Sequence, residues 1–227
     1  MVIPGLGSGY YKLKRLSAVW YIKLSKLIGV EFFDTAPLYD TEVILGRAKL
    51  RNVKIITKVG LTTDFDAEVD STARWQHFST TLIRSSLDMS LERLGVGRVY
   101  GYLLHCISAG VNLDEQIEAL KDLKLNGKVE MIGFSIDHLS DLPKNFDWAD
   151  LIEVPIGILY DVPLKSHQII VINGVHRAIK GRENVESYCI EHPDQLVIAL
   201  TGSSKVRRLG GFVAWARVLN FKASRYI

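Results

Sequence analysis

Cysteine is scarce in this chain of 227 residues, which has only Cys106 and Cys189, far apart in the sequence. Two distant cysteines without metal-ligand spacing provide neither a disulfide framework nor a cysteine zinc site. Long apolar runs are also lacking, and the N-terminus has no apolar core of the signal-peptide kind, so neither a membrane-spanning helix nor secretion is predicted. We therefore expect a cytoplasmic protein with reduced thiols.

An excess of charge of one sign is missing as well. The formal net charge is only +3, and the lysines and arginines are scattered rather than gathered in one stripe with interleaved aromatic residues. The usual signature of a nucleic-acid-binding protein is therefore absent. A mildly basic chain is compatible with a phosphate-bearing ligand but does not by itself indicate one.

No Gly/Ser-rich linker, low-complexity tract or block of like charge divides the chain. Because 48% of the residues are hydrophobic, the chain can bury a large core. Barrels of α/β type often exceed the usual length of a domain. Residues 1–227 are therefore expected to form a single domain.

Short β-type runs alternate with longer amphipathic segments, which is the pattern of repeated βα units around a parallel sheet. There are about eight such runs, which predicts a compact (β/α)8 TIM barrel with short loops. Helical spacing of apolar residues predicts helices over Leu13–Leu27, Ser79–Leu94 and Leu113–Leu125. The predicted strands are Val2–Leu6, Glu31–Asp34, Val53–Lys58, Val99–His105, Glu130–Ser135, Leu151–Val154, Gln168–Asn173 and Leu196–Thr201.

Polar residues stand at the carboxyl ends of five predicted strands. In a parallel barrel these ends open on one face, where barrel active sites are built. A structural ion pair would explain a single buried charge, but the convergence of an acid, a base and a phenol from several strands is typical of a reactive site. The five residues are Asp34, Lys58, His105, Ser135 and Thr201.

The most informative stretch is Glu31–Gly46, a short apolar strand ending in Asp34, then a proline-marked loop with Tyr39, then the opening of a helix. A phenol has a reference pKa of about 10, so it exchanges protons poorly at neutral pH unless its environment changes. A nearby ammonium such as Lys58 favours the phenolate, and a carboxylate such as Asp34 keeps the ammonium in place. His105 could then orient a substrate carbonyl or share the proton.

This stretch resembles the signature of the aldo-keto reductases, in which a strand ends in Asp-Thr-Ala and Tyr, Glu and Gly follow in register. Ile55–Gly60 looks like the family's lysine strand, and Val99–His105 looks like its histidine strand. Leu123–Ser135 is similar to the family's Gly-Lys-Val-Arg-x-Ile-Gly-Val-Ser segment. The resemblance implies a TIM barrel and a reductase that needs no metal. The residues that match the signature are Asp34, Tyr39, Glu42 and Gly46.

The resemblance also implies roles for the matching residues. Tyr39 would be the general acid/base that protonates the substrate oxygen as hydride arrives from a nicotinamide, and Lys58 would tune its pKa. Asp34 would be the partner of Lys58, and His105 would orient the substrate. The implied reaction is the NAD(P)H-dependent reduction of a small aldehyde, ketone or sugar-like compound, or the oxidation of the corresponding alcohol. Taken singly, each residue has a structural alternative: Asp34 as a cap, Lys58 as a solvated lysine, His105 as a core histidine.

Positions that bind the cofactor follow from the same resemblance. Ser135 stands where the family's carboxamide-binding serine lies, but the usual Asn beside it is Ile136. The family's Gln is Glu153, which can accept a hydrogen bond from the carboxamide but cannot donate one.

Ala199–Leu209 resembles the family's loop for the adenosine phosphate, because glycine and hydroxyl residues there can expose backbone N–H groups to an anion. An ordinary solvated helix start is the alternative. Lys205 or Arg207 could add positive charge, and NADP(H) is weakly preferred over NAD(H). The residues assigned to this loop are Gly202, Ser203, Ser204 and Arg208.

The seventh strand departs most from the family. Gln168–Arg177 lacks the aromatic-rich stretch and Ser-Pro turn that carry the nicotinamide-stacking side chain and the pyrophosphate contacts. Two alternatives therefore stay open: a lyase, dehydratase or isomerase that uses Tyr39 or Lys58 without a nicotinamide, and a non-catalytic binding barrel. Three aromatic residues follow predicted strand ends and could reach the mouth of the site: Tyr10, Tyr11 and Trp75.

Overall fold

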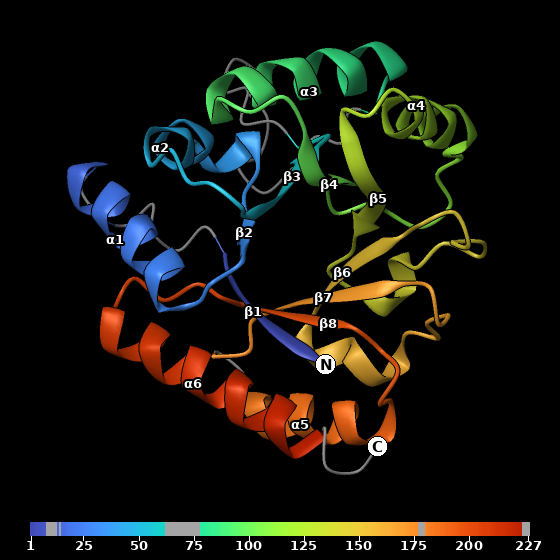
Figure 1. The fold of residues 1–227 in the computed structure, drawn as a ribbon. Coiled ribbons are helices and arrows are strands. Elements are labelled where there is room, and N and C mark those ends of the chain that lie inside the picture. Colours follow the sequence, from blue (N-terminus) through green and yellow to red (C-terminus); the bar gives the residue numbers. More distant parts are fainter. Residues whose placement is uncertain (8–12, 14, 62–77, 177–179, 224–227) are drawn as a thin grey trace, which may run out of the picture.

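Eight parallel strands close into a barrel in the computed structural model, which describes residues 1–7, 13, 15–61, 78–176 and 180–223, without the side chains of residues 15 and 221–223. Each strand pairs with its neighbour in the sequence, and the first and last strands pair to close the sheet (Figure 1). The prediction of a (β/α)8 barrel is confirmed, and the ends of every predicted strand lie within one residue of the observed ends. The strands are β1 (Val2–Leu6), β2 (Phe32–Asp34), β3 (Lys54–Val59), β4 (Val99–Leu104), β5 (Val129–Ser135), β6 (Leu151–Pro155), β7 (Ile169–Asn173) and β8 (Val197–Thr201).

The α-helices surround the barrel, and α1 (Arg15–Ile28) lies beside α6 (Val206–Ala223) (Figure 1). The three predicted helices correspond to α1, α3 and α4. Two described connections differ from a regular βα unit: β5 leads to β6 through the 3-10 helix η3 (Leu139–Asp141), and β6 leads to β7 through η4 (Ile156–Asp161). The remaining α-helices are α2 (Glu42–Arg47), α3 (Thr80–Leu94), α4 (Asp114–Leu125) and α5 (Gly181–Glu191).

Capping residues explain where α3 begins and ends. The Ser79 side chain accepts a hydrogen bond of 3.2 Å from the backbone N–H of Leu82, which would otherwise have no partner within the helix. Gly95 ends the helix in the left-handed region, with φ of 67°, where a side chain would be strained.

Apolar side chains pack in two layers, one inside the barrel and one between the strands and the helices. Because both faces of these parallel strands are covered, all six residues of β4 are buried. Successive side chains on a strand point to opposite faces: Phe32 belongs to the inner layer and Phe33 to the outer layer. The inner layer consists of Phe32, Ile56, Tyr100, Leu103, Leu151, Ile169, Val171, Ile198 and Leu200.

The helices in the described part of the chain are too short or too polar to cross a lipid bilayer.

Candidate active site

Strand alternation aims the candidate residues into the barrel. Phe32 packs in the inner layer, so Asp34, two residues further along β2, faces the same interior. In β3, Ile56 places Lys58 in the same way. Because the strands are parallel, these side chains converge at the carboxyl end of the barrel. The same step of two residues relates Leu103 to His105, Leu151 to Glu153 and Val171 to Asn173.

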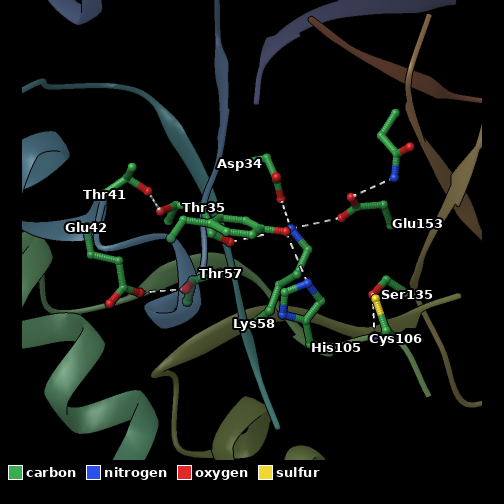
Figure 2. A network of polar contacts seen from close by, with 12 residues as sticks. Asp34, Thr35, Thr41, Glu42, Thr57, Lys58, His105, Cys106, Ser135 and Glu153 are labelled. Carbon is green, nitrogen blue, oxygen red and sulfur yellow. Dashed lines mark hydrogen bonds and ion pairs between the residues drawn. The ribbon is translucent and has the colours of Figure 1, made fainter. Parts of the chain in front are cut away.

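The Lys58 ammonium lies between two carboxylates. It forms a hydrogen-bonded ion pair with Asp34, and its Nζ atom lies 3.1 Å from Oε2 of Glu153 (Figure 2). The three side chains are almost completely buried, with 1% of Lys58 and 6% of each carboxylate side chain exposed. A buried ammonium needs such partners because an isolated charge in the protein interior is very costly. The structure therefore confirms the predicted pairing of Asp34 with Lys58 and adds Glu153 as a second partner.

Tyr39 lies beside this cluster as the last residue of the 3-10 helix η2 (Pro37–Tyr39). The fixed φ angle of Pro37 suits the first position of a helix. The Tyr39 hydroxyl lies 3.1 Å from Nε2 of His105. The Lys58 ammonium lies 5.7 Å from the centroid of the Tyr39 ring, within range of a cation–π interaction. The structure thus brings the four matching residues, Asp34, Tyr39, Lys58 and His105, into one group.

Hydrogen bonds fix the loop that presents Tyr39. The hydroxyls of Thr35 and Thr41 are 2.7 Å apart and close the loop across its base. Glu42, at the start of α2, accepts a hydrogen bond of 2.6 Å from Thr57 in β3 and one of 2.7 Å from Arg93 in α3. Thr35 and Glu42 of the family signature therefore hold the loop that carries Tyr39 against the barrel wall.

Gly46, the last residue of the signature, permits close contact between α2 and α3. A Cβ atom at this position would lie 2.3 Å from the carbonyl oxygen of Arg93. Only glycine fits there without displacing the backbone.

Electrostatics favour a protonated Lys58 and a carboxyl group that titrates near neutrality. Burial raises the pKa of the Asp34 carboxyl to about 7, and Glu153 adds to the rise while Lys58 opposes it. Burial alone would lower the pKa of Lys58, but the attraction of Asp34 and Glu153 outweighs burial, so that pKa lies above its ordinary value. The ammonium therefore persists at neutral pH.

The balance at Tyr39 differs from the prediction. Burial raises the pKa of the Tyr39 phenol well above its ordinary value, and the charges of Asp34, Glu153 and Cys106 add to this, while Lys58 lowers it. Lys58 has the predicted effect, but burial and the two carboxylates exceed it. Tyr39 consequently keeps its proton at neutral pH.

A cavity of about 1390 Å³ opens onto this group. Asp34, Tyr39 and His105 form part of its wall, whereas Lys58 lies behind them. The wall also carries cationic side chains from α5, α6 and the loop after β8. These cations are Arg182, Lys205, Arg207 and Arg208.

Ser135 and Glu153, two predicted cofactor residues, face each other across β5 and β6 and both line the cavity. The Ser135 hydroxyl accepts a hydrogen bond of 2.7 Å from the backbone N–H of Cys106. Glu153 accepts a hydrogen bond of 3.3 Å from Asn173 through Oε1. Its other oxygen, Oε2, is buried beside Lys58 and receives no well-aligned hydrogen bond from the described residues.

The loop after β8 reaches the same cavity. Gly202, Ser203 and Arg208 line it, whereas Ser204 lies outside the wall formed by the described residues. The Ser203 N–H donates a hydrogen bond of 3.3 Å to Thr201, and the Ser203 carbonyl accepts one from the Tyr21 hydroxyl. The loop is therefore held from two sides, next to the first turn of α6.

Several residues of the cavity were missed by the sequence interpretation. Asn173 was detectable, because it ends a predicted strand just as Asp34 does. His176 and Arg182 line the cavity after β7, where no family pattern was found. Cys106 has a left-handed backbone conformation, with φ of 51°, and no pattern in the sequence predicts this conformation. The predicted aromatic residues of the mouth, Tyr10, Tyr11 and Trp75, lie outside the described residues.

Neither cysteine forms a disulfide within the structure as described, and no group of three or more His, Cys, Asp or Glu side chains among the described residues is arranged to hold a metal ion.

A sequence model described as the Aldo/keto reductase family matches residues 7–180, about three quarters of the chain. The chain belongs to the aldo-keto reductase family. Two curated relatives illustrate the sequence similarity. A methylglyoxal reductase of Salmonella typhi is 29% identical over 137 residues, which cover 60% of this chain and 48% of the relative. An L-galactose dehydrogenase of Arabidopsis thaliana is 34% identical over 168 residues, covering 67% of this chain and 47% of the relative. The matched part of this aldo-keto reductase thus spans about half the length of these relatives.

Solved structures share the fold of this aldo-keto reductase. An aldo-keto reductase from Klebsiella pneumoniae in complex with NADPH superimposes with a TM-score of 0.67 at 21% identity, covering 96% of this chain and 85% of the other. A glycerol dehydrogenase from Gluconobacter oxydans gives a TM-score of 0.68 at 18% identity, covering 99% and 92%. At these identities the comparison shows a common fold.

Proposed function

We propose that this aldo-keto reductase is an NAD(P)H-dependent oxidoreductase that reduces a small aldehyde, ketone or sugar-like carbonyl, or oxidises the corresponding alcohol. The observation that carries the proposal is the position of the Tyr39 hydroxyl, 3.1 Å from Nε2 of His105 at the wall of the large cavity and next to the Lys58 cluster. Two groups able to donate hydrogen bonds thus converge where a carbonyl oxygen can bind.

In the proposed reaction, a substrate carbonyl oxygen binds between the Tyr39 hydroxyl and His105. These contacts draw electron density onto the oxygen as it gains negative charge. Because the raised pKa of Tyr39 keeps the phenol protonated, Tyr39 acts as the general acid and passes its proton to that oxygen. Lys58, held by Asp34 and Glu153, stabilises the phenolate that remains. In the oxidative direction the same groups remove the proton from an alcohol.

The residues present fit a nicotinamide dinucleotide. Its phosphates are anionic, and the wall supplies cations in the first turn of α6 and after β8. For the nicotinamide end of the cofactor, Glu153 and Ser135 lie side by side in the cavity wall, where they can face a carboxamide. When bound, the nicotinamide supplies or accepts the hydride. The residues proposed to hold it are Ser135, Glu153, Gly202, Ser203 and Arg208.

NADP(H) is the proposed preference over NAD(H). Arg207 and Arg208 line the cavity within the first turn of α6, and Lys205 precedes them. An extra phosphate on the adenosine ribose would give these cations a doubly charged partner.

A second candidate function rests on the same group without a nicotinamide. Glu153 already binds Lys58 and Asn173, so its capacity to hold a carboxamide is reduced. Ile136 is buried and has no side-chain hydrogen bond to offer. A lyase, dehydratase or isomerase could use Tyr39 and Lys58 for proton transfer next to a carbonyl.

The experiment that tests the proposed function is the consumption of NADPH or NADH, followed by absorbance, with a panel of small carbonyl compounds. Methylglyoxal is a sensible first member, because one relative carries that substrate in its name. Carbonyl-dependent consumption that is lost in Tyr39→Phe supports the proposal. Conversion of a carbonyl compound without any change in the nicotinamide would support the second function instead.

A further inference from the structure

Together, Glu153 and Asp34 bring more negative charge into the cluster than the single ammonium of Lys58 can balance. Asp34 from β2 and Glu153 from β6 both approach the Lys58 ammonium (Figure 2). Within the described part of the chain, Lys58 is the one cation within ion-pair distance of either carboxylate. With both carboxyls ionised the buried group has a net charge of one negative unit, which is unfavourable in a site of this burial.

Neutral partners surround the rest of Glu153. Its Oε1 accepts a hydrogen bond from Asn173, which stabilises the carboxylate but brings no charge. Ser135, the register partner of Glu153 on β5, is also uncharged. Among the described residues, Lys58 on β3 and Tyr39 on η2 interact with the two carboxyls, and His105 and Cys106 after β4 act on Tyr39.

We propose that Glu153 is a positioning residue that shares Lys58 with Asp34, and that its unbalanced negative charge makes Asp34 hold an exchangeable proton, which sets the charge of the catalytic group. Two carboxylates beside one ammonium repel each other, so the charge of Glu153 favours the protonated form of Asp34. With that proton bound the group of three is neutral, and after its loss the group carries one negative charge beside Tyr39.

The direction of the pKa shift agrees with this charge count. Burial and Glu153 together raise the pKa of Asp34 from 3.8 to about 7. The folded protein therefore holds a proton that the unfolded chain has already released in the window between these values. The stabilisation that this proton provides is complete at the acidic end of the window, declines as pH rises and is lost above about 7.

The consequence for Tyr39 rests on the proposed function. The negative form of the group makes ionisation of the phenol less favourable, and the neutral form makes it easier. Glu153 thus opposes Lys58 at Tyr39, and its neutral replacement by Gln should lower the pKa of the phenol. In turnover experiments, Glu153→Gln should move the pH dependence of the turnover rate along the pH axis. A uniform reduction of the rate at every pH is not expected.

The decisive experiment uses the purified protein without any nicotinamide. The free energy of unfolding is measured by denaturant titration at several pH values between about 4 and 8 for the wild type, Glu153→Gln and Glu42→Gln. Glu42 is a matched control, because its carboxylate is equally buried but bonds Thr57 and Arg93 outside the cluster. We expect the pH-dependent loss of stability in the wild type and in Glu42→Gln, and a flatter profile in Glu153→Gln. An unchanged profile in Glu153→Gln overturns the proposal.

Carboxyl carbon NMR keeps the proposal testable even if Glu153→Gln does not fold. Wild-type protein labelled in its Asp and Glu carboxyls should show a resonance that titrates near neutral pH and is absent from Asp34→Asn. Titration of all carboxyls in the ordinary acidic range would contradict a proton held by Asp34. Both measurements are independent of activity, so a protein that binds no nicotinamide but shows this titration would refute the proposed function alone.

Discussion

The Nε2 atom of His105 lies 3.1 Å from the hydroxyl of Tyr39, and the two rings meet edge to face at an angle of 84°. Residues separated by 66 positions in the sequence are therefore in direct contact, because Tyr39 follows β2 and His105 follows β4. In the proposed function, this pair is where an oxygen atom of the substrate accepts hydrogen bonds. Each prediction below tests a part of the structure that supports this point.

Tyr39→Phe should remove the proton donor while keeping the ring in place. We expect a loss of turnover of roughly 10²–10⁴-fold, the usual contribution of a general acid. The free energy of unfolding should change little, because the ring still packs over Lys58. Steady-state kinetics and denaturant unfolding of the same variant separate the two effects. Turnover equal to that of the wild type would remove Tyr39 from the mechanism.

Lys58→Met should destabilise the fold, because it leaves Asp34 and Glu153 buried without their cation. The expected cost is about 3–5 kcal/mol, as for other buried ion pairs that lose one partner. Lys128→Met provides the control, since the pair of Lys128 with Asp88 is exposed and should contribute less than about 1 kcal/mol. Urea unfolding of both variants at neutral pH measures the difference. Equal stabilities would show that the cluster is not the buried ion pair described.

Gly46→Ala should disturb the anchor of the tyrosine loop. The added Cβ would lie 2.3 Å from the Arg93 carbonyl, so we expect a loss of about 1–3 kcal/mol in the free energy of unfolding. Gly210→Ala, within α6, is the matched control: nothing lies within 4 Å of its Cβ, and alanine favours a helix by about 1 kcal/mol. Thermal unfolding should rank the variants Gly210→Ala, wild type, Gly46→Ala, from most to least stable. The reverse order would refute the close contact of α2 with α3.

Arg208→Ala should weaken the binding of NADPH more than that of NADH. A charged hydrogen bond to a phosphate contributes about 1.5–3 kcal/mol, so the affinity for NADPH should fall by roughly tenfold or more. Arg98→Ala is the control, because Arg98 is exposed just before β4, at the opposite end of the barrel. Equal losses for both cofactors in Arg208→Ala would place the discrimination elsewhere.

The barrel was predictable because apolar runs of strand length recur between amphipathic segments, and a parallel strand buried on both faces is apolar throughout. The convergence of Asp34, Lys58 and His105 was predictable for a related reason: each lies at the carboxyl end of a strand, two residues after an inner apolar side chain. The contact of Asn173 with Glu153 follows the same rule and was overlooked.

Other features depend on spacings that a sequence does not display. The pairing of Glu153 with Lys58 joins β6 to β3 across the barrel, and its 3.1 Å distance follows from the closure of the sheet. The net rise in the pKa of Tyr39 is the sum of the effects of burial and of four neighbouring charged groups, and a local sequence pattern does not reveal this sum. His176 and Arg182 reach the cavity from a region where the family pattern is lost.

The measurement that tests the central claim most directly is the binding of NADPH and NADH to the purified protein, by fluorescence and calorimetry, with thermal stabilisation as an independent readout. The account predicts binding in the micromolar range, tighter for NADPH, with an accompanying rise in the unfolding temperature. Absence of binding by the reduced and oxidised forms of both cofactors would contradict hydride transfer and leave proton transfer at Tyr39 and Lys58 as the chemistry of this site.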